Sequence, residues 1–200
     1  SRTDAGVHAL GQVAVCRIDL AIDAETFKRA LHNLLPQDIS VRSVEETSLE
    51  FHPRRNVDEK CYYYHFFLQP PSPFISRYGV YMKHLNLQVL EPALESFIGT
   101  HDFRSFCTGD QGRTTIRTIN SIELHHFKRW GIYQVRVSGP SFLRHMVRRL
   151  IGASFHVAAS HMSTQEALSY LNHVRELKDP KYSFFVASPQ GLLLHAIRYK

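Results

Sequence analysis

Long apolar runs, paired cysteines and metal-binding motifs are all missing from this sequence. No run reaches the roughly 18 apolar residues of a membrane-spanning helix, so we expect none. The three cysteines, Cys16, Cys61 and Cys107, are far apart, which argues against a disulfide framework or a cysteine zinc site and favours a reducing cytoplasm. No HExxH motif occurs among the 13 histidines, and His125 and His126 are adjacent rather than spaced for joint ligation. We therefore expect no bound metal.

The balance of charge favours a polyanionic partner. The chain carries 24 Lys and Arg against 18 Asp and Glu, a formal net charge of +6, and its pI is about 9.3. Release of counterions and long-range attraction favour binding of such a chain to nucleic acid. With 44% hydrophobic residues in 200, the sequence also predicts an ordered globular protein.

The hydrophobic pattern predicts helices and strands mixed along the chain. Helices are expected at residues 24–35, 87–98, 142–157 and 164–174, and strands at 12–18, 39–44, 60–68, 117–127, 132–138 and 192–199. From residue 60 onward this order fits a βαββαβ unit with one extra helix, and the first segment fits the back half of another. We therefore predict an α+β fold with helices on one face of a largely antiparallel sheet, and expect one strand and one helix upstream of Ser1.

The segment RTDAGVH at residues 2–8 concentrates functional residue types in a loop before the first expected strand. One interpretation is a simple turn, in which Asp4 bonds its own backbone and Gly6 takes a positive φ. The other is a carboxylate held ionised by a nearby guanidinium, as a nucleophile requires. The residues alone leave both open.

The strand at 60–68 and the helix at 142–157 each permit two interpretations. Alternation places Tyr62 and Tyr64 on one face of the strand and Tyr63 on the other, as core partners or as platforms for a base. In the helix, a step of about 100° per residue gathers four basic side chains on one face, either solvated or bound to phosphates. These are Arg144, His145, Arg148 and Arg149.

The segment RTDAGVHALGQV at residues 2–13 resembles the signature of the tRNA pseudouridine synthase A (TruA) family. Further family-like segments follow in the same order. They are NLLPQDI (33–39), FHPR (51–54), KCYYY (60–64), HDFRSF (101–106), FLRHMVR (142–148) and GL (191–192). The resemblance spans residues 2 to about 199 and includes no upstream segment, so the chain is identified as an N-terminally truncated member.

The resemblance implies a fold of two ferredoxin-like halves that form a mixed, mainly antiparallel sheet with a central active-site cleft. Residues 1–50 would be the remainder of the N-terminal half, and residues 51–200 the C-terminal half. It implies isomerisation of uridine to pseudouridine at positions 38–40 in the anticodon stem-loop of tRNA, by a homodimer. An isomerisation needs no redox cofactor or metal, so no cofactor is expected.

Site residues follow from the same resemblance. Asp4 matches the family's catalytic aspartate, Arg148 its paired arginine, and Tyr62 the tyrosine that stacks on uracil. Arg2 matches an arginine that helps to displace the target base, and Leu192 an apolar residue that lines the pocket. Three further residues are expected to contact RNA: His8, Arg144 and Arg149.

Three other functions stay open at this level. A non-catalytic RNA-binding module would use the same aromatic and basic residues, but it would not need the combination of Asp4, Tyr62 and Arg148. A pseudouridine synthase of another RNA would carry the same site. A phosphodiester hydrolase would need a carboxylate cluster or a histidine pair for metal, and the sequence contains neither motif.

Overall fold

The structure is a computed structural model, and it describes residues 2–19, 21–109, 114–182 and 185–200. The chain forms two compact units. The larger comprises Ser1–Gln12 and Val57–Lys200, and the smaller comprises Val13–Asn56. The opening loop with Asp4 therefore belongs to the same unit as the C-terminal part of the chain. The division between residues 50 and 51 stays a prediction.

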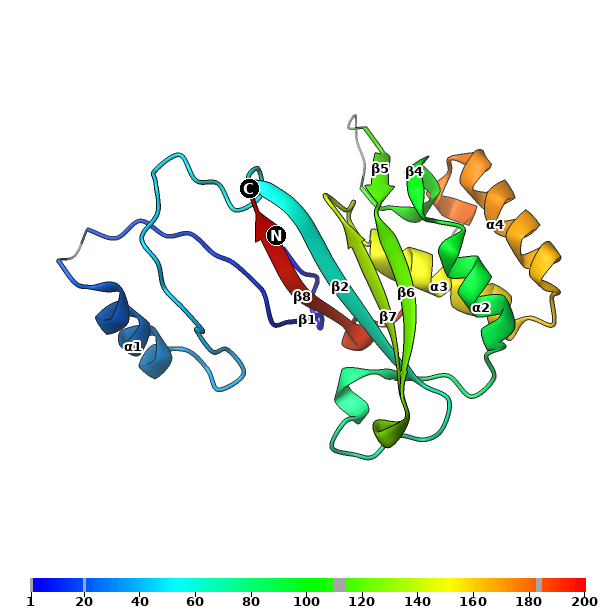
Figure 1. Cartoon of the computed structure of the whole chain (residues 1–200), viewed down its shortest axis with the longest axis horizontal. Helices are drawn as coiled ribbons and strands as arrows, with labels where there is room; N and C mark the ends of the chain where they lie inside the picture. Colours follow the sequence, from blue (N-terminus) through cyan, green and yellow to red (C-terminus); the bar gives the residue numbers. More distant parts are fainter. Residues whose placement is uncertain (1, 20, 110–113, 183–184) are drawn as a thin grey trace. The chain divides into compact units, whose positions relative to one another are not determined.

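A mixed, mainly antiparallel sheet organises the larger unit (Figure 1). Its strands are β1 (His8–Ala9), β2 (Val57–Phe67), β3 (Val80–Tyr81), β6 (Ser121–Phe127), β7 (Ile132–Gly139) and β8 (Leu192–Tyr199). The spatial order is β1-β8-β2-β7-β6, with β3 paired to β2. Only the β1–β8 and β2–β3 pairs are parallel. Strands β8, β2, β7 and β6 are neighbours in the order of a ferredoxin-like βαββαβ unit.

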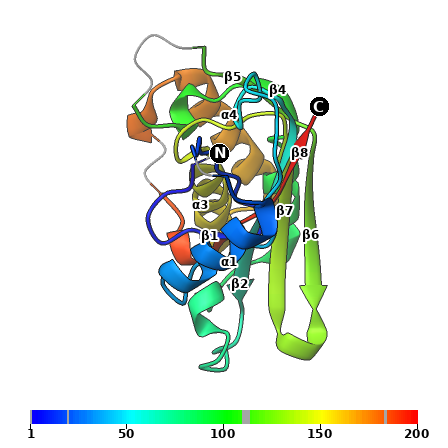
Figure 2. The same ribbon diagram turned by 90° about the vertical axis from the view of Figure 1, so that its left-hand side faces the viewer.

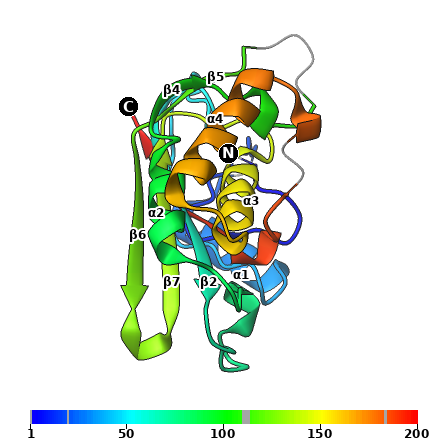
Figure 3. The same cartoon turned by 90° about the vertical axis from the view of Figure 1, so that its right-hand side faces the viewer.

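The helices of the larger unit are α2 (Leu87–Glu95), α3 (Met146–Ala159) and α4 (Thr164–Leu177). A small second sheet joins β4 (Gly99–Asp102) to β5 (Ile116–Ile119). Figures 2 and 3 show α3 and α4 on the same side of the strands, which confirms the predicted α+β architecture. The longest helices have 14 residues each, and none in the described part of the chain could cross a membrane.

Alternation along β2 builds the core. Tyr64 and Phe66 are buried, and both rings meet the edge of Phe155 on α3. Tyr63 points to the opposite face, where it stacks on His195 of β8 with ring centroids 4.2 Å apart. The prediction that Tyr63 lies on the opposite face from Tyr62 and Tyr64 is confirmed. Successive side chains of a strand alternate between its two faces.

The smaller unit departs from the sequence-based prediction. Its helix is present as α1 (Ala24–Leu34), where the Asp23 side chain accepts a hydrogen bond from the Thr26 backbone N–H at 2.8 Å. The strands expected at residues 12–18 and 39–44 are wrong, because neither segment has regular structure. An alternating pattern becomes a strand only when its backbone pairs with a neighbour, and no described strand pairs with either segment.

Three helix boundaries also differ from the prediction. Helix α4 ends at Leu177, not at Val174. Helix α2 ends at Glu95, not at residue 98, and α3 begins at Met146, not at Phe142. The delayed start of α3 has a local cause, because His145 adopts a left-handed conformation with a φ of 62°. A right-handed helix cannot continue through such a residue.

We expect Phe97→Ala to lower the free energy of unfolding by about 3–5 kcal/mol, because removing a buried aromatic leaves a cavity. Phe97 is 1% exposed and lies edge-on to Phe106. Urea denaturation measures the effect. Phe74→Ala is the matched control, because Phe74 belongs to the same unit and is 90% exposed. Equal losses in the two variants would contradict this placement of the core.

Candidate functional site

The opening loop is fixed to the edge of β8. The Val7 N–H donates to the Asp4 carbonyl at 3.1 Å, and Gly6 completes the turn with a φ of 78°. Strand β1 then pairs with β8, and the N–H groups of Leu10 and Gly11 both donate to the Leu194 carbonyl. Gly6 therefore has the positive φ of the turn interpretation, but the Asp4 side chain bonds to Arg148 rather than to its own backbone.

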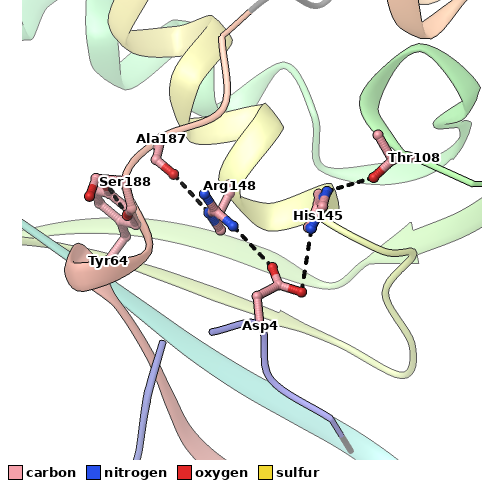
Figure 4. Close-up of polar contacts among 7 residues, drawn as sticks. All are labelled: Asp4, Tyr64, Thr108, His145, Arg148, Ala187 and Ser188. Carbon is pink, nitrogen blue, oxygen red and sulfur yellow. Dashed lines mark hydrogen bonds and ion pairs between the residues drawn. The ribbon is translucent and has the colours of Figure 1, made fainter. Parts of the chain in front are cut away.

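The Asp4 carboxylate lies between two basic side chains near the start of α3 (Figure 4). Its Oδ2 accepts a hydrogen bond from Nη1 of Arg148 at 3.1 Å, and its Oδ1 is 3.5 Å from Nε2 of His145. The Asp4 side chain is 30% exposed and that of Arg148 is 13% exposed. The pair is thus partly shielded from water while the carboxylate stays accessible.

A second set of contacts holds Arg148 in place. Its Nε donates to the Ala187 carbonyl at 2.8 Å, and the Ala187 N–H donates to the Arg148 carbonyl at 3.0 Å. The neighbouring Ser188 carbonyl accepts a hydrogen bond from the Tyr64 hydroxyl at 3.0 Å. Burial raises the pKa of Tyr64, so this hydroxyl keeps its proton. The guanidinium is therefore oriented by backbone that is itself bonded to the central strand.

Helix α3 and the segment before β8 approach each other closely at Gly152. A Cβ atom at this position would collide with the Phe185 carbonyl. Glycine thus permits the short separation that brings the Ala187 backbone to Arg148.

His145 is fixed from the side opposite Asp4. Its Nδ1 lies 2.6 Å from Oγ1 of Thr108, and the Thr108 N–H donates to the Arg144 carbonyl at 3.2 Å. Burial lowers the pKa of His145, and the guanidinium groups of Arg148, Arg144 and Arg149 lower it further, while Asp4 raises it. The imidazole is therefore biased toward its neutral form at neutral pH.

Tyr62 and Leu192 lie in the interior, on the face of the sheet that the helices cover. Tyr62 is 8% exposed and its ring meets the edge of Phe142 with centroids 5.3 Å apart. Leu192 is 5% exposed and stands opposite Tyr64 in the register of β2 and β8. Burial of this kind fits the core interpretation of both residues in this conformation, and their contacts with a base stay a prediction.

The expected RNA-contacting residues differ in their exposure. Arg2 and Arg144 are exposed, and His8 bonds through Nε2 to the Arg77 carbonyl at 3.2 Å. Arg149 departs from the predicted basic face. It is 9% exposed and its Nη1 donates to the Pro180 carbonyl at 3.0 Å, because the segment after α4 covers that side of α3.

Two residues of the site have no assigned role in the sequence-based hypothesis. His145 is named there only as part of the basic face, and Thr108 is absent. Thr108 lies in a loop 37 residues before His145, and no spacing or motif connects the two. Only the fold brings them together, so no local sequence signal could have found this contact.

The site consists of one accessible carboxylate, one guanidinium and one imidazole biased toward its neutral form. A carboxylate in this position can act as a nucleophile or accept a proton. Within the described residues, no group of three or more His, Cys, Asp or Glu side chains is placed to hold a metal ion.

Comparison with known proteins gives one consistent result. Residues 93–200 match the family model described as tRNA pseudouridine synthase. The tRNA pseudouridine synthase A of Pseudothermotoga lettingae is 39% identical over 201 residues, which cover 99% of this chain and 80% of the relative. The tRNA pseudouridine synthase A 2 of Bacillus thuringiensis subsp. konkukian is 33% identical over 202 residues, which cover 100% of this chain and 80% of the relative. These alignments include both the Asp4 loop and α3.

The charges around His145 predict opposite pKa shifts in two variants. Asp4→Asn should lower the pKa of His145 further, because the carboxylate is the group that raises it. Arg148→Met should raise that pKa, because a nearby cation is lost. NMR titration of the His145 ring protons measures both. Asp58→Asn, in an exposed ion pair with Arg198, is the control and should leave the titration unchanged. Shifts of the same sign in the first two variants would contradict the arrangement.

Proposed function

Since this chain belongs to the tRNA pseudouridine synthase A (TruA) family, isomerases that convert uridine to pseudouridine in tRNA, we propose that Asp4 is its catalytic carboxylate. The observation that supports this role most strongly is the hydrogen bond from Arg148 to Oδ2 of Asp4. It places a guanidinium against a carboxylate that is still 30% exposed. Catalysis requires this combination of charge and access.

The reaction breaks the bond between uracil N1 and ribose C1′, turns the base and rejoins it to C1′ through C5. The C5 proton leaves and N1 gains a proton, so no electrons enter or leave and the proposal needs no redox cofactor or metal. Asp4 can attack C1′ or assist removal of a proton. Arg148 would hold the carboxylate in place through both.

We further propose that the substrate uridines are at positions 38–40 of the anticodon stem-loop. The target must leave its stack, which costs a few kcal/mol. Arg2 is exposed two residues before Asp4 and would fill the vacated space, while the Tyr62 ring would receive the base beside Leu192. The net charge of +6 supports binding of tRNA.

The quaternary and cellular context belongs to the same proposal. We propose a homodimer with two ferredoxin-like halves in each subunit and the site in a central cleft. The ferredoxin-like order of β8, β2, β7 and β6 supports the assignment for one half. Bacterial relatives and three free cysteines are consistent with a cytoplasmic enzyme.

We expect Asp4→Asn to reduce the rate of turnover by more than about 10³-fold with tRNA affinity nearly unchanged, since the amide keeps the shape but loses the charge. The measurement is tritium release from tRNA labelled at uridine C5, with the product site mapped, using protein expressed from its complete reading frame. Asp58→Asn is the matched control and should retain normal activity, because its carboxylate belongs to an exposed ion pair. Substantial turnover by Asp4→Asn would exclude the catalytic role, and a product outside positions 38–40 would exclude only the site assignment.

A further inference from the structure

The two oxygens of the Asp4 carboxylate have different surroundings. Oδ2 accepts the hydrogen bond of Arg148 at 3.1 Å. Oδ1 faces Nε2 of His145 at 3.5 Å, which is longer than a normal hydrogen bond. Oδ1 therefore lies next to a ring nitrogen without a short hydrogen bond to it, so its lone pairs can still interact with a substrate. Oδ2, in contrast, is hydrogen-bonded to Arg148.

His145 itself is fixed by backbone and side chain together. Its φ of 62° is uncommon for a residue other than glycine, and such conformations persist only where the surroundings impose them. Here Thr108 contacts the ring at Nδ1, and its N–H bonds to the carbonyl of Arg144, the residue before His145. The loop after β4 thus holds both the peptide and the ring of His145.

The Asp4 carboxylate favours one tautomer of the neutral ring. A hydroxyl can donate to Nδ1 or accept from it, but an acceptor oxygen 3.5 Å from Nε2 favours the tautomer with its proton on Nε2, in which the Thr108 hydroxyl donates to Nδ1. The titratable groups around the ring are Asp4 from the opening loop and Arg144, Arg148 and Arg149 from α3 and the residues before it. Three cations and burial oppose a charge on the ring, and one carboxylate favours it.

We propose that His145, oriented by Thr108, is a positioning residue that directs Oδ1 of Asp4 toward the substrate as the reacting oxygen. This inference rests on the proposed catalytic role of Asp4. In the neutral ring, an Nε2–H group 3.5 Å from Oδ1 would limit rotation of the carboxylate without binding it tightly. Neither nitrogen of His145 exchanges a proton with the substrate in this role.

Protonation of the ring would impair this arrangement. An imidazolium beside Asp4 would bind Oδ1 as an ion pair, and its Nδ1–H would then have to donate to Thr108. Burial and the nearby arginines keep the pKa of His145 below its ordinary value of 6.5. The rate of the chemical step should therefore fall as the pH drops through that lowered pKa and be constant above it.

Three substitutions at one position separate the possible roles of His145. In His145→Gln the amide nitrogen reaches about as far as Nε2 but does not titrate, so most of the rate should return and the acid limb should disappear. His145→Asn accepts the left-handed backbone but is too short to reach Asp4. His145→Leu has neither a donor nor a suitable backbone preference. The single-turnover rates of His145→Asn and His145→Leu should be about 10- to 100-fold lower, with nearly normal tRNA affinity.

Thr108→Val tests the other end of the contact. Loss of the hydroxyl removes the contact that orients the ring, so the single-turnover rate should fall while the Kd for tRNA stays nearly unchanged. His173→Leu, at an exposed position on α4, is the control for loss of a histidine and should match the unmodified enzyme. Urea unfolding of each variant identifies losses that arise from instability.

The readouts are the single-turnover rate of tritium release between about pH 5 and 8, and the Kd for tRNA. Normal rates and an unchanged acid limb in His145→Leu and His145→Asn would overturn the inference, while an inactive Asp4→Asn would leave the role of Asp4 intact. A loss confined to tRNA affinity would also overturn it and make His145 an RNA contact. An active Asp4→Asn would instead remove the proposed function on which the inference rests.

Discussion

The ion pair between Asp4 and Arg148 connects residues 144 positions apart in the chain, and the candidate site depends on it. An ion pair between exposed side chains contributes little to the free energy of folding. Here, however, Arg148 is only 13% exposed and also bonds to the Ala187 carbonyl. Removing the carboxylate would leave a shielded guanidinium with one partner fewer. The pair thus joins the opening loop, α3 and the segment before β8 in a single arrangement.

The sheet makes this arrangement possible. Strand β8 lies between β1 and β2, so the segment that carries Asp4 and the strand that carries Tyr64 are separated by one strand. The segment leading into β8 supplies two carbonyls, from Ala187 and Ser188, that fix Arg148 and Tyr64. Backbone rather than further charged side chains therefore does most of the positioning. Such support is rigid, and it adds no competing ionisable group beside Asp4.

Much of the larger unit could be predicted from its pattern. The strand at residues 192–199 is present with the predicted bounds, and the three predicted helices lie in the predicted order among the strands. The strand expected at residues 117–127 is instead two strands in different sheets, β5 and β6, and the short strands β3 and β4 were not predicted. Alternation also predicted the opposite faces of Tyr63 and Tyr64. These features depend on local periodicity, which a sequence contains directly.

The errors share a physical cause. Residues 12–18 and 39–44 alternate like strands, but a strand also needs a paired neighbour, which local pattern cannot supply. Arg149 falls on the polar side of a helical wheel, yet the chain after α4 packs over it. The contact of Thr108 with His145 likewise depends on the tertiary path of a loop. The resemblance to a known family indicated the catalytic candidates, and the tertiary structure determined their surroundings.

The central claim is that catalysis depends on where the Asp4 carboxylate lies as well as on its charge. Single-turnover tritium release by Asp4→Glu tests this most directly, because glutamate keeps the charge and moves the carboxylate by one methylene. We predict that the single-turnover rate falls by about 10²-fold or more, as expected for a misplacement of the carboxylate by about 1 Å. The affinity for tRNA should be nearly unchanged. A rate close to that of the unmodified enzyme would contradict the account, because the position set by Arg148 and His145 would then be unimportant for the reaction.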